Sequence, residues 1–283
     1  MLRLCAFADE ASADLNEQIV ALKQNGLSLL ELRSIDGVSV INFTDEAISR
    51  YKKTLADNGI KVWSIGSPIG KVDIKEDFDE YLVKVRRICH IANAFDCKRV
   101  RMFSFFNAYD SRDVVMDRLN VMVNIAKEYG VMLCHENEKH IYGDIADRVL
   151  EIVKNVKDIN IVYDPANYLQ CDEDAYEAFT KTIPYTDYLH IKDVDLTDGS
   201  LVPAGYGNGK IAQILKDISH LDTTLTVEPH LKVFDGYNSI DSEVLKNKFA
   251  FTSSREAFDC AINSLKDLLK NAGYKEVDGG YTI

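Results

Sequence analysis

Residues 129–138 read YGVMLCHENE, and this stretch contains the unit from which the whole chain is built. Gly130 suits the left-handed backbone conformation in which many helices end. The apolar run that begins at Val131 has the length and composition of a buried parallel strand. Polar residues, Glu136 among them, follow where that strand ends. The order of helix end, short apolar run and polar residue therefore predicts one strand followed by the next helix.

Similar units follow one another along the 283 residues. The apolar runs begin near Leu2, Leu27, Ile60, Arg99, Val131, Ile159, Thr186 and Thr223. Most of the segments between them have helical periodicity, as in residues 14–22, 45–56, 78–94, 114–126 and 146–153. Strand–helix units repeated in this way close most naturally into an α/β protein with a single (β/α)8 TIM barrel. A doubly wound open sheet would need a glycine-rich turn after the first strand, and residues 6–10, AFADE, contain none.

The chain contains no linker rich in proline, glycine and serine. We therefore expect one barrel over residues 1–273, followed by a C-terminal surface extension over residues 274–283. The irregular stretch at residues 234–248, after the last strand, is a candidate loop over the barrel mouth.

The formal net charge is −12 and the predicted pI is about 5.0. This acidic balance argues against nucleic acid or an anionic membrane surface as the main partner, since both are bound through an excess of Lys and Arg. Six scattered cysteines without metal-site spacing favour free thiols. We expect a cytoplasmic protein without a membrane span; both a monomer and a homodimer are compatible with the sequence.

Four consecutive strands in the second half end in residues that bind metals. They are Glu136, Asp164 in IVYDPAN, His190 in YLHIKD, and Glu228 in LTVEPH. In a barrel these strand ends meet at one rim. Three carboxylates placed together repel one another unless a cation compensates. Three oxygens and one imidazole suit a single divalent metal ion, Mn²⁺, Mg²⁺, Co²⁺ or Zn²⁺.

These same motifs resemble those of the sugar phosphate isomerase/epimerase family, the xylose isomerase-like TIM barrels. The resemblance extends over residues 2–272 and includes the glycine-rich segment PAGYGNGK at 203–210. It implies that Glu136, Asp164, His190 and Glu228 hold one divalent metal. In the ketose 3-epimerase branch, the first and last glutamates also exchange the proton, so Glu136 and Glu228 inherit that catalytic role. The substrate implied is a small sugar or sugar phosphate that reacts through an enediolate.

Four further residues are candidates for binding substrate. Lys192 and His230 share the strand phase of His190 and Glu228, so both are expected to face the pocket. Arg33 either contacts substrate or forms a rim ion pair with Glu31. Asn167 stands where relatives that bind more metals often carry histidine, which disfavours an additional metal site.

Two other interpretations concern anions and alternative functions. The glycines of segment 203–210 either offer backbone N–H groups to an anion or form an ordinary turn. A metal-dependent dehydratase of inosose or dehydroshikimate type would use the same scaffold. An AP-endonuclease-like enzyme and a non-enzymatic sugar-binding protein are further alternatives.

Overall fold

The computed structural model describes residues 1–234 and 246–283, and it contains the expected closed barrel. The parallel strands follow the order β1-β2-β5-β6-β7-β8-β9-β12, and β12 pairs with β1 to close the ring. Their bounds are Leu2–Ala6, Leu29–Leu32, Lys61–Gly66, Arg99–Met102, Met132–Glu136, Asn160–Tyr163, Thr186–Ile191 and Thr223–Val227. Each corresponds to one of the apolar runs identified in the sequence. The fold is a single (β/α)8 TIM barrel.

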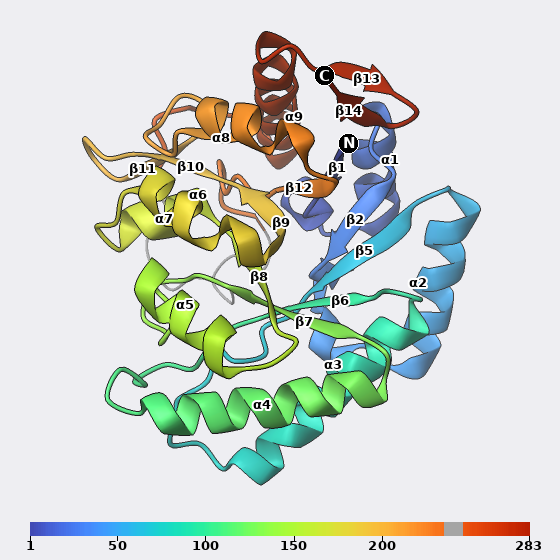
Figure 1. Ribbon diagram of the computed structural model, residues 1–283. Helices are drawn as coiled ribbons and strands as arrows, with labels where there is room; N and C mark the ends of the chain where they lie inside the picture. Colours follow the sequence, from blue (N-terminus) through green and yellow to red (C-terminus); the bar gives the residue numbers. More distant parts are fainter. Residues whose placement is uncertain (235–245) are drawn as a thin grey trace.

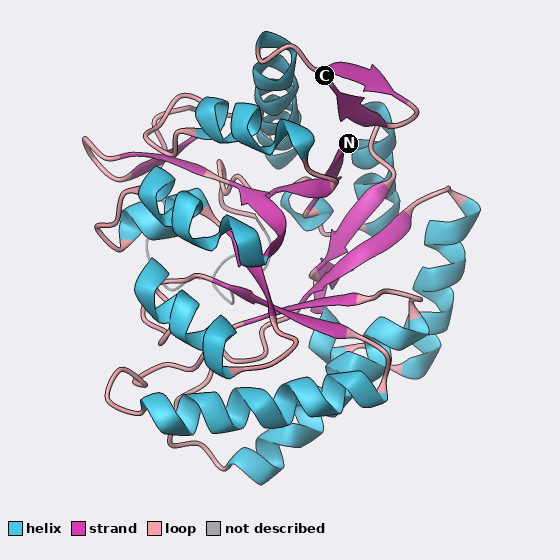
Figure 2. Cartoon of the chain, viewed as in Figure 1, coloured by secondary structure: helices cyan, strands magenta, loops and turns pink. Residues whose placement is uncertain are grey.

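The helices surround these strands, as Figures 1 and 2 show. Their bounds are α1 Leu15–Gln24, α2 Asp45–Asp57, α3 Phe78–Ala94, α4 Arg112–Glu128, α5 Ala146–Asn155, α6 Pro165–Gln170, α7 Ala175–Thr182, α8 Ile211–Asp217 and α9 Ser254–Asn271. Short 3-10 helices lie at Ala8–Glu10, Val40–Asn42, Ile183–Tyr185 and Ile218–His220. The barrel thus presents its strand ends to loops and its sides to helices.

Ser12, Thr44 and Ser111 each precede a segment with helical periodicity, so the sequence predicts them as helix caps, and the structure agrees only in part. The Thr44 hydroxyl accepts a hydrogen bond from the Ala47 N–H at the start of α2, as its position predicts. Before α1 the cap is Asp14, whose carboxylate accepts from two backbone N–H groups, and not Ser12. Asp14 caps the helix because it immediately precedes the first helical residue, whereas Ser12 lies too far upstream.

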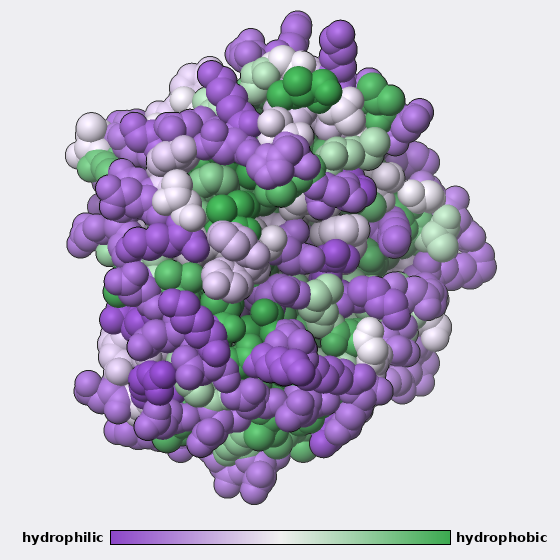
Figure 3. Space-filling model, in the orientation of Figure 1, coloured by the Kyte–Doolittle hydropathy of each residue, from purple (hydrophilic) through white to green (hydrophobic). Residues whose placement is uncertain are grey.

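Each helix buries one face against the barrel and exposes the other. In α3, for example, Val85, Ile88 and Ala92 are buried at helical spacing. The surface in Figure 3 is accordingly mostly hydrophilic, with apolar residues visible mainly in the middle of that face. In the described part of the chain, no helix combines the length and the apolar character needed to cross a membrane. All six cysteines are free.

Among the described residues, three small hairpins lie outside the ring of parallel strands. They are β3 with β4 (Ser34–Ile35 and Val38–Ser39), β10 with β11 (Asp193–Asp195 and Ser200–Val202), and β13 with β14 (Lys275–Val277 and Gly280–Thr282). β14 pairs with the start of β1 through Tyr281 and Leu2, so the C-terminal hairpin extends the sheet there. The candidate loop over the mouth, residues 234–248, falls largely on positions 235–245, outside the described residues.

Candidate metal and active site

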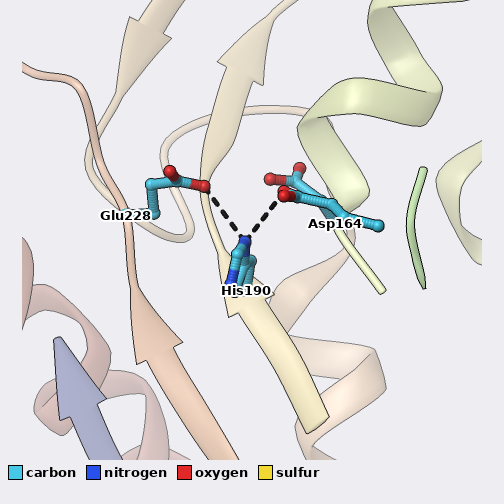
Figure 4. A group of neighbouring side chains, drawn as sticks. Asp164, His190 and Glu228 are labelled. Atoms are coloured by element: carbon cyan, nitrogen blue, oxygen red, sulfur yellow. Dashed lines mark hydrogen bonds and ion pairs between the residues drawn. The ribbon is translucent and has the colours of Figure 1, made fainter. Parts of the chain in front are cut away.

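The four strand-end residues lie together at the C-terminal rim of the barrel. Glu136 is the last residue of β7, His190 lies within β9, and Asp164 and Glu228 directly follow β8 and β12. Each offers one ligand atom, and these four atoms all lie within 4.8 Å of one another. All four side chains are buried. Figure 4 shows Asp164 and Glu228 pointing toward His190 from its two sides.

The His190 ring is at the centre of this cluster. Its Nδ1 atom lies 2.8 Å from Glu136 Oε1 and 3.0 Å from Glu228 Oε2. Burial alone would lower the pKa of His190, but the charges of Glu136, Glu31 and Glu228 outweigh burial and raise this pKa well above its ordinary value. A positive charge is therefore strongly favoured at the point where these oxygens meet Nδ1.

The other ring nitrogen of His190 faces Glu31, which the sequence placed at the rim beside Arg33 and not against His190. The Nε2–Glu31 Oε2 distance is 3.2 Å, and Tyr188 donates its hydroxyl hydrogen to Glu31 Oε1 at 2.8 Å. Burial would raise the pKa of Glu31, but the His190 charge outweighs it and lowers this pKa. The expected rim pair between Glu31 and Arg33 is wrong, because Glu31 reaches across the barrel interior to β9. The available sequence signal was a single carboxylate inside the apolar run of β2.

Two arginines bind the outer oxygens of Glu136 and Glu228. Arg101 Nη1 lies 3.1 Å from Glu136 Oε2 and 3.4 Å from Glu228 Oε1. Arg33 Nη1 lies 2.9 Å from the same Glu228 oxygen, and the rest of its guanidinium group forms two 2.9 Å bonds to Asp9. The arginines thus bind the oxygens that point away from His190. The inner oxygens, Glu136 Oε1 and Glu228 Oε2, remain directed at His190.

Asp164 is fixed by its neighbours on the chain and by Lys192. Its Oδ1 atom accepts from the Asn167 backbone N–H at 2.9 Å, as the N-cap of α6. Its buried Oδ2 atom lies 3.0 Å from Lys192 Nζ but has no hydrogen-bond partner among the described residues. Burial raises the pKa of Asp164 to about 6 despite Lys192, and the charges of Glu136 and Glu228 add to that rise. A further cation would stabilise this carboxylate.

The predicted substrate-binding residues all surround the cluster and are buried. Lys192 contacts Asp164, Arg33 contacts Glu228, and Asn167 Nδ2 lies 3.5 Å from Glu136 Oε1. His230 Nε2 lies 3.4 Å from Glu10 Oε1 and 3.7 Å from Glu228 Oε1.

Glu10, Glu228 and His230 form a second group whose ligand atoms lie within 4.8 Å of one another. There Arg33 already supplies a positive charge, because it pairs with both Glu10 and Glu228. Burial raises the pKa of Glu10 to about 8, even though Arg33 opposes this shift. This group is therefore less suited to a metal than the first.

The donor set of the first group fits one divalent ion. It combines three carboxylates with one imidazole, the ligands that Mg²⁺, Mn²⁺ and Zn²⁺ accept in proteins. Two carboxylate oxygens face one ring nitrogen, and a third carboxylate has an oxygen without a hydrogen-bond donor. These atoms leave a position between them where only a proton or a cation is favourable.

The glycine-rich segment 203–210 binds a side-chain carboxylate of the same chain. The backbone N–H groups of Gly205, Gly207 and Gly209 all donate to the Asp193 carboxylate, at 2.8–3.1 Å. A Cβ atom at Gly207 would lie 2.4 Å from Asp193 Oδ1, so the close approach requires glycine. The interpretation of this segment as a site for an external anion is therefore wrong for these three N–H groups.

Solved structures with the same fold include proteins of several activities. An L-ribulose 3-epimerase is 19% identical, with a TM-score of 0.75, and the alignment covers 96% of each chain. The probable 3-DHS dehydratase AsbF from Bacillus anthracis is 16% identical, with a TM-score of 0.72 over 94% of this chain and 99% of that one. The IOLI protein with a bound zinc atom is 15% identical, with a TM-score of 0.73 over 95% and 99%.

At these identities the likeness to solved structures concerns the fold. No curated protein sequence matches the chain. The sequence model of the xylose isomerase-like TIM barrels matches residues 19–243, which is most of the chain. The four rim residues identified above all lie within this match. The chain belongs to the xylose isomerase-like TIM barrel family.

Proposed function

We propose that this protein is a divalent-metal-dependent isomerase or epimerase of a sugar or sugar phosphate. The observation that carries the proposal is the convergence of Glu136, Asp164, His190 and Glu228 around one point. Fold relatives include an L-ribulose 3-epimerase and a zinc-bound protein, which is compatible with such chemistry on this scaffold. The proposed site is a small-molecule site inside the barrel mouth, and neither nucleic acid nor membrane is proposed as a partner.

The bound metal would polarise a substrate carbonyl and acidify the neighbouring C–H bond. Glu136 and Glu228 approach from β7 and β12 and are the proposed base and acid. One of them takes the proton from carbon and the other returns a proton, which changes the configuration or moves the carbonyl. Burial would raise the pKa of Glu228, but the charges of His190 and Lys192 outweigh burial and lower this pKa well below its ordinary value.

The buried residues around the two glutamates have supporting roles. Arg101 contacts both carboxylates and holds them in place, while the burial of the cluster keeps bulk water from the reacting carbon. Arg33, Lys192, His230 and Asn167 are the proposed substrate-binding residues, because each lies beside a proposed metal ligand. Their donors match the hydroxyl and carbonyl oxygens of a sugar.

A panel of ketoses incubated in D₂O tests this proposal. We expect metal-dependent deuterium incorporation next to the carbonyl, and a substrate isomer as product. Glu136→Gln and Glu228→Gln should each lose about 10²–10⁴-fold of this exchange, the usual contribution of a positioned acid or base. Glu138→Gln is the matched control, because Glu138 is a rim carboxylate that pairs with Lys71 and is outside the ligand group. Full exchange in both glutamine variants would contradict the assigned roles.

A metal-dependent dehydratase is the second candidate. The fold relative AsbF is a probable 3-DHS dehydratase, and a dehydratase would use the same ligands to form an enolate before a β-hydroxyl group leaves. The two reactions differ in their products. Loss of water from a cyclic keto acid or an inosose, with no isomer formed from any ketose, would favour the dehydratase.

A further inference from the structure

Glu31 is a carboxylate enclosed in the barrel interior. It lies in β2 between Leu30 and Leu32, and its exposed fraction is 0%. An ionised group in such a place requires hydrogen-bond partners, because burial without them is very unfavourable. The structure supplies those partners from two other strands of the barrel, β5 and β9.

The contacts of Glu31 divide between its two oxygens. Oε1 accepts from the Tyr188 hydroxyl at 2.8 Å and the Ser64 hydroxyl at 3.3 Å. Oε2 lies 3.2 Å from Nε2 of His190. A carboxylate of this kind accepts hydrogen bonds, so the proton of the His190 ring belongs on Nε2. With that proton on Nε2, the lone pair of Nδ1 would be available to a cation that also binds the inner oxygens of Glu136 and Glu228.

Two aromatic rings restrict the His190 ring further. Phe7 meets it edge-on, with ring centroids 5.3 Å apart and an angle of 82° between the planes. Tyr188 lies 5.6 Å away at 62°. The ring is therefore held by packing on its sides and by Glu31 at its far nitrogen.

We propose that Glu31 is a positioning residue that fixes the tautomer and the orientation of His190, so that Nδ1 is presented to the metal. The proposal rests on the metal site of the proposed function. Outer carboxylates that bind the free nitrogen of a ligating histidine commonly contribute 10–100-fold to metal affinity. In this chain the contact is made by a β2 residue to a β9 residue, across the inside of the barrel.

The test is the affinity of the full-length protein for Zn²⁺ or Mn²⁺, measured by calorimetry or by competition with a chelating dye. Glu31→Gln keeps an acceptor oxygen and should weaken binding by about 10-fold, and Glu31→Ala, which removes the acceptor, by up to about 100-fold. Glu138→Gln also removes one half-buried rim carboxylate, which pairs with Lys71 and not with His190, and should change the affinity much less. Nitrogen NMR of the zinc-loaded protein supplies a second readout. The Nε2–H signal of His190 should persist in Glu31→Gln and be lost to exchange or shifted in Glu31→Ala.

Three outcomes separate this proposal from the proposed function. If the wild-type chain binds no divalent ion, the metal site itself and Glu31's role are both contradicted. If the wild type binds the ion and folded Glu31→Ala binds it equally well, or Glu138→Gln loses as much affinity, only the role of Glu31 is overturned. If affinity falls in the expected order but no ketose exchanges deuterium, the positioning role stands and the proposed reaction fails.

Discussion

At the scale of single residues, the two oxygens of each proposed ligand glutamate have different partners. Glu136 directs one oxygen to His190 and the other to Arg101. Glu228 directs one to His190 and the other to Arg33 and Arg101. The arginines would thus leave one oxygen of each carboxylate available to a metal. They also replace water as hydrogen-bond donors, which keeps the cluster buried and ordered.

His135, the neighbour of Glu136, supplies a prediction about acid stability. It is buried and hydrogen-bonded to Ser104 Oγ at 2.9 Å, and burial lowers its pKa to about 3. Its pKa in the unfolded chain is about 6.5. The unfolded state therefore binds the extra proton first, and stability should fall as the pH drops from about 6.5 toward 3, by at most about 1.4 kcal/mol per pH unit.

Urea unfolding of the metal-free protein at pH 7 and pH 5 measures this effect. His135→Gln removes the titrating group, so its stability should decline less than that of the wild type over this interval. Parallel declines in the two proteins would show that other groups cause the acid sensitivity.

Sequence and structure agree on the residues that end the strands, and differ on contacts across the barrel. Glu136 and Glu228 could be identified because each ends an apolar run, and in a barrel all such ends meet. The contact of Glu31 with His190 depends on strand tilt and register, which a single sequence does not reveal. Arg101 was recognisable as a polar strand end, but its shared contact with two glutamates was not predictable.

At the scale of elements, the loop from β5 to α3 depends on Gly70. Its φ angle is +91°, and a Cβ atom there would lie 2.0 Å from the Phe103 carbonyl oxygen. Gly59 has a similar φ of +73°, but nothing lies within 4 Å of its would-be Cβ. Gly59→Ala should therefore cost only the left-handed backbone conformation, about 1–2 kcal/mol. Gly70→Ala should cost that amount and a steric clash of about 1–3 kcal/mol more.

Chemical denaturation of both alanine variants measures the difference. Equal losses would indicate that the Phe103 backbone moves away freely. A larger loss in Gly59→Ala would contradict the packing described for this loop.

The glycine-rich segment between β11 and α8 shows how local sequence can mislead. Three alternating glycines predict a loop that exposes N–H groups, and the structure has those groups directed at one carboxylate. That carboxylate, Asp193, directly follows Lys192, so the glycine segment binds the residue next to one that contacts the cluster. The glycines correctly indicated a loop whose N–H groups can bind an anion. The carboxylate that they bind, however, lies more than ten residues earlier in the chain.

At the scale of the whole molecule, the two ends of the barrel differ in the residues that they carry. The C-terminal ends of the strands carry the cluster of Glu136, Asp164, His190 and Glu228, the proposed metal ligands. At the other end, β14 pairs with the start of β1, and both Tyr274 and Tyr281 are buried. We propose that residues 274–283 are an extension that stabilises this end and does not contribute to the cluster.

Truncation after Gly273 tests that separation. Loss of two buried tyrosines should lower the free energy of unfolding by roughly 3–6 kcal/mol, at roughly 1.5–3 kcal/mol each. Metal affinity measured well below the unfolding temperature should stay unchanged. A truncated chain that keeps full stability, or one that stays folded but loses the metal, would contradict this division.

The most direct test of the central claim is the metal content of the purified protein after incubation with Mn²⁺, Mg²⁺, Co²⁺ or Zn²⁺ and removal of excess ion. The account predicts about one tightly held divalent ion per chain in the wild type, and its loss in Glu136→Gln and in His190→Ala. A folded wild-type chain that holds none of these ions, or a His190→Ala variant that retains the ion with unchanged affinity, would contradict it.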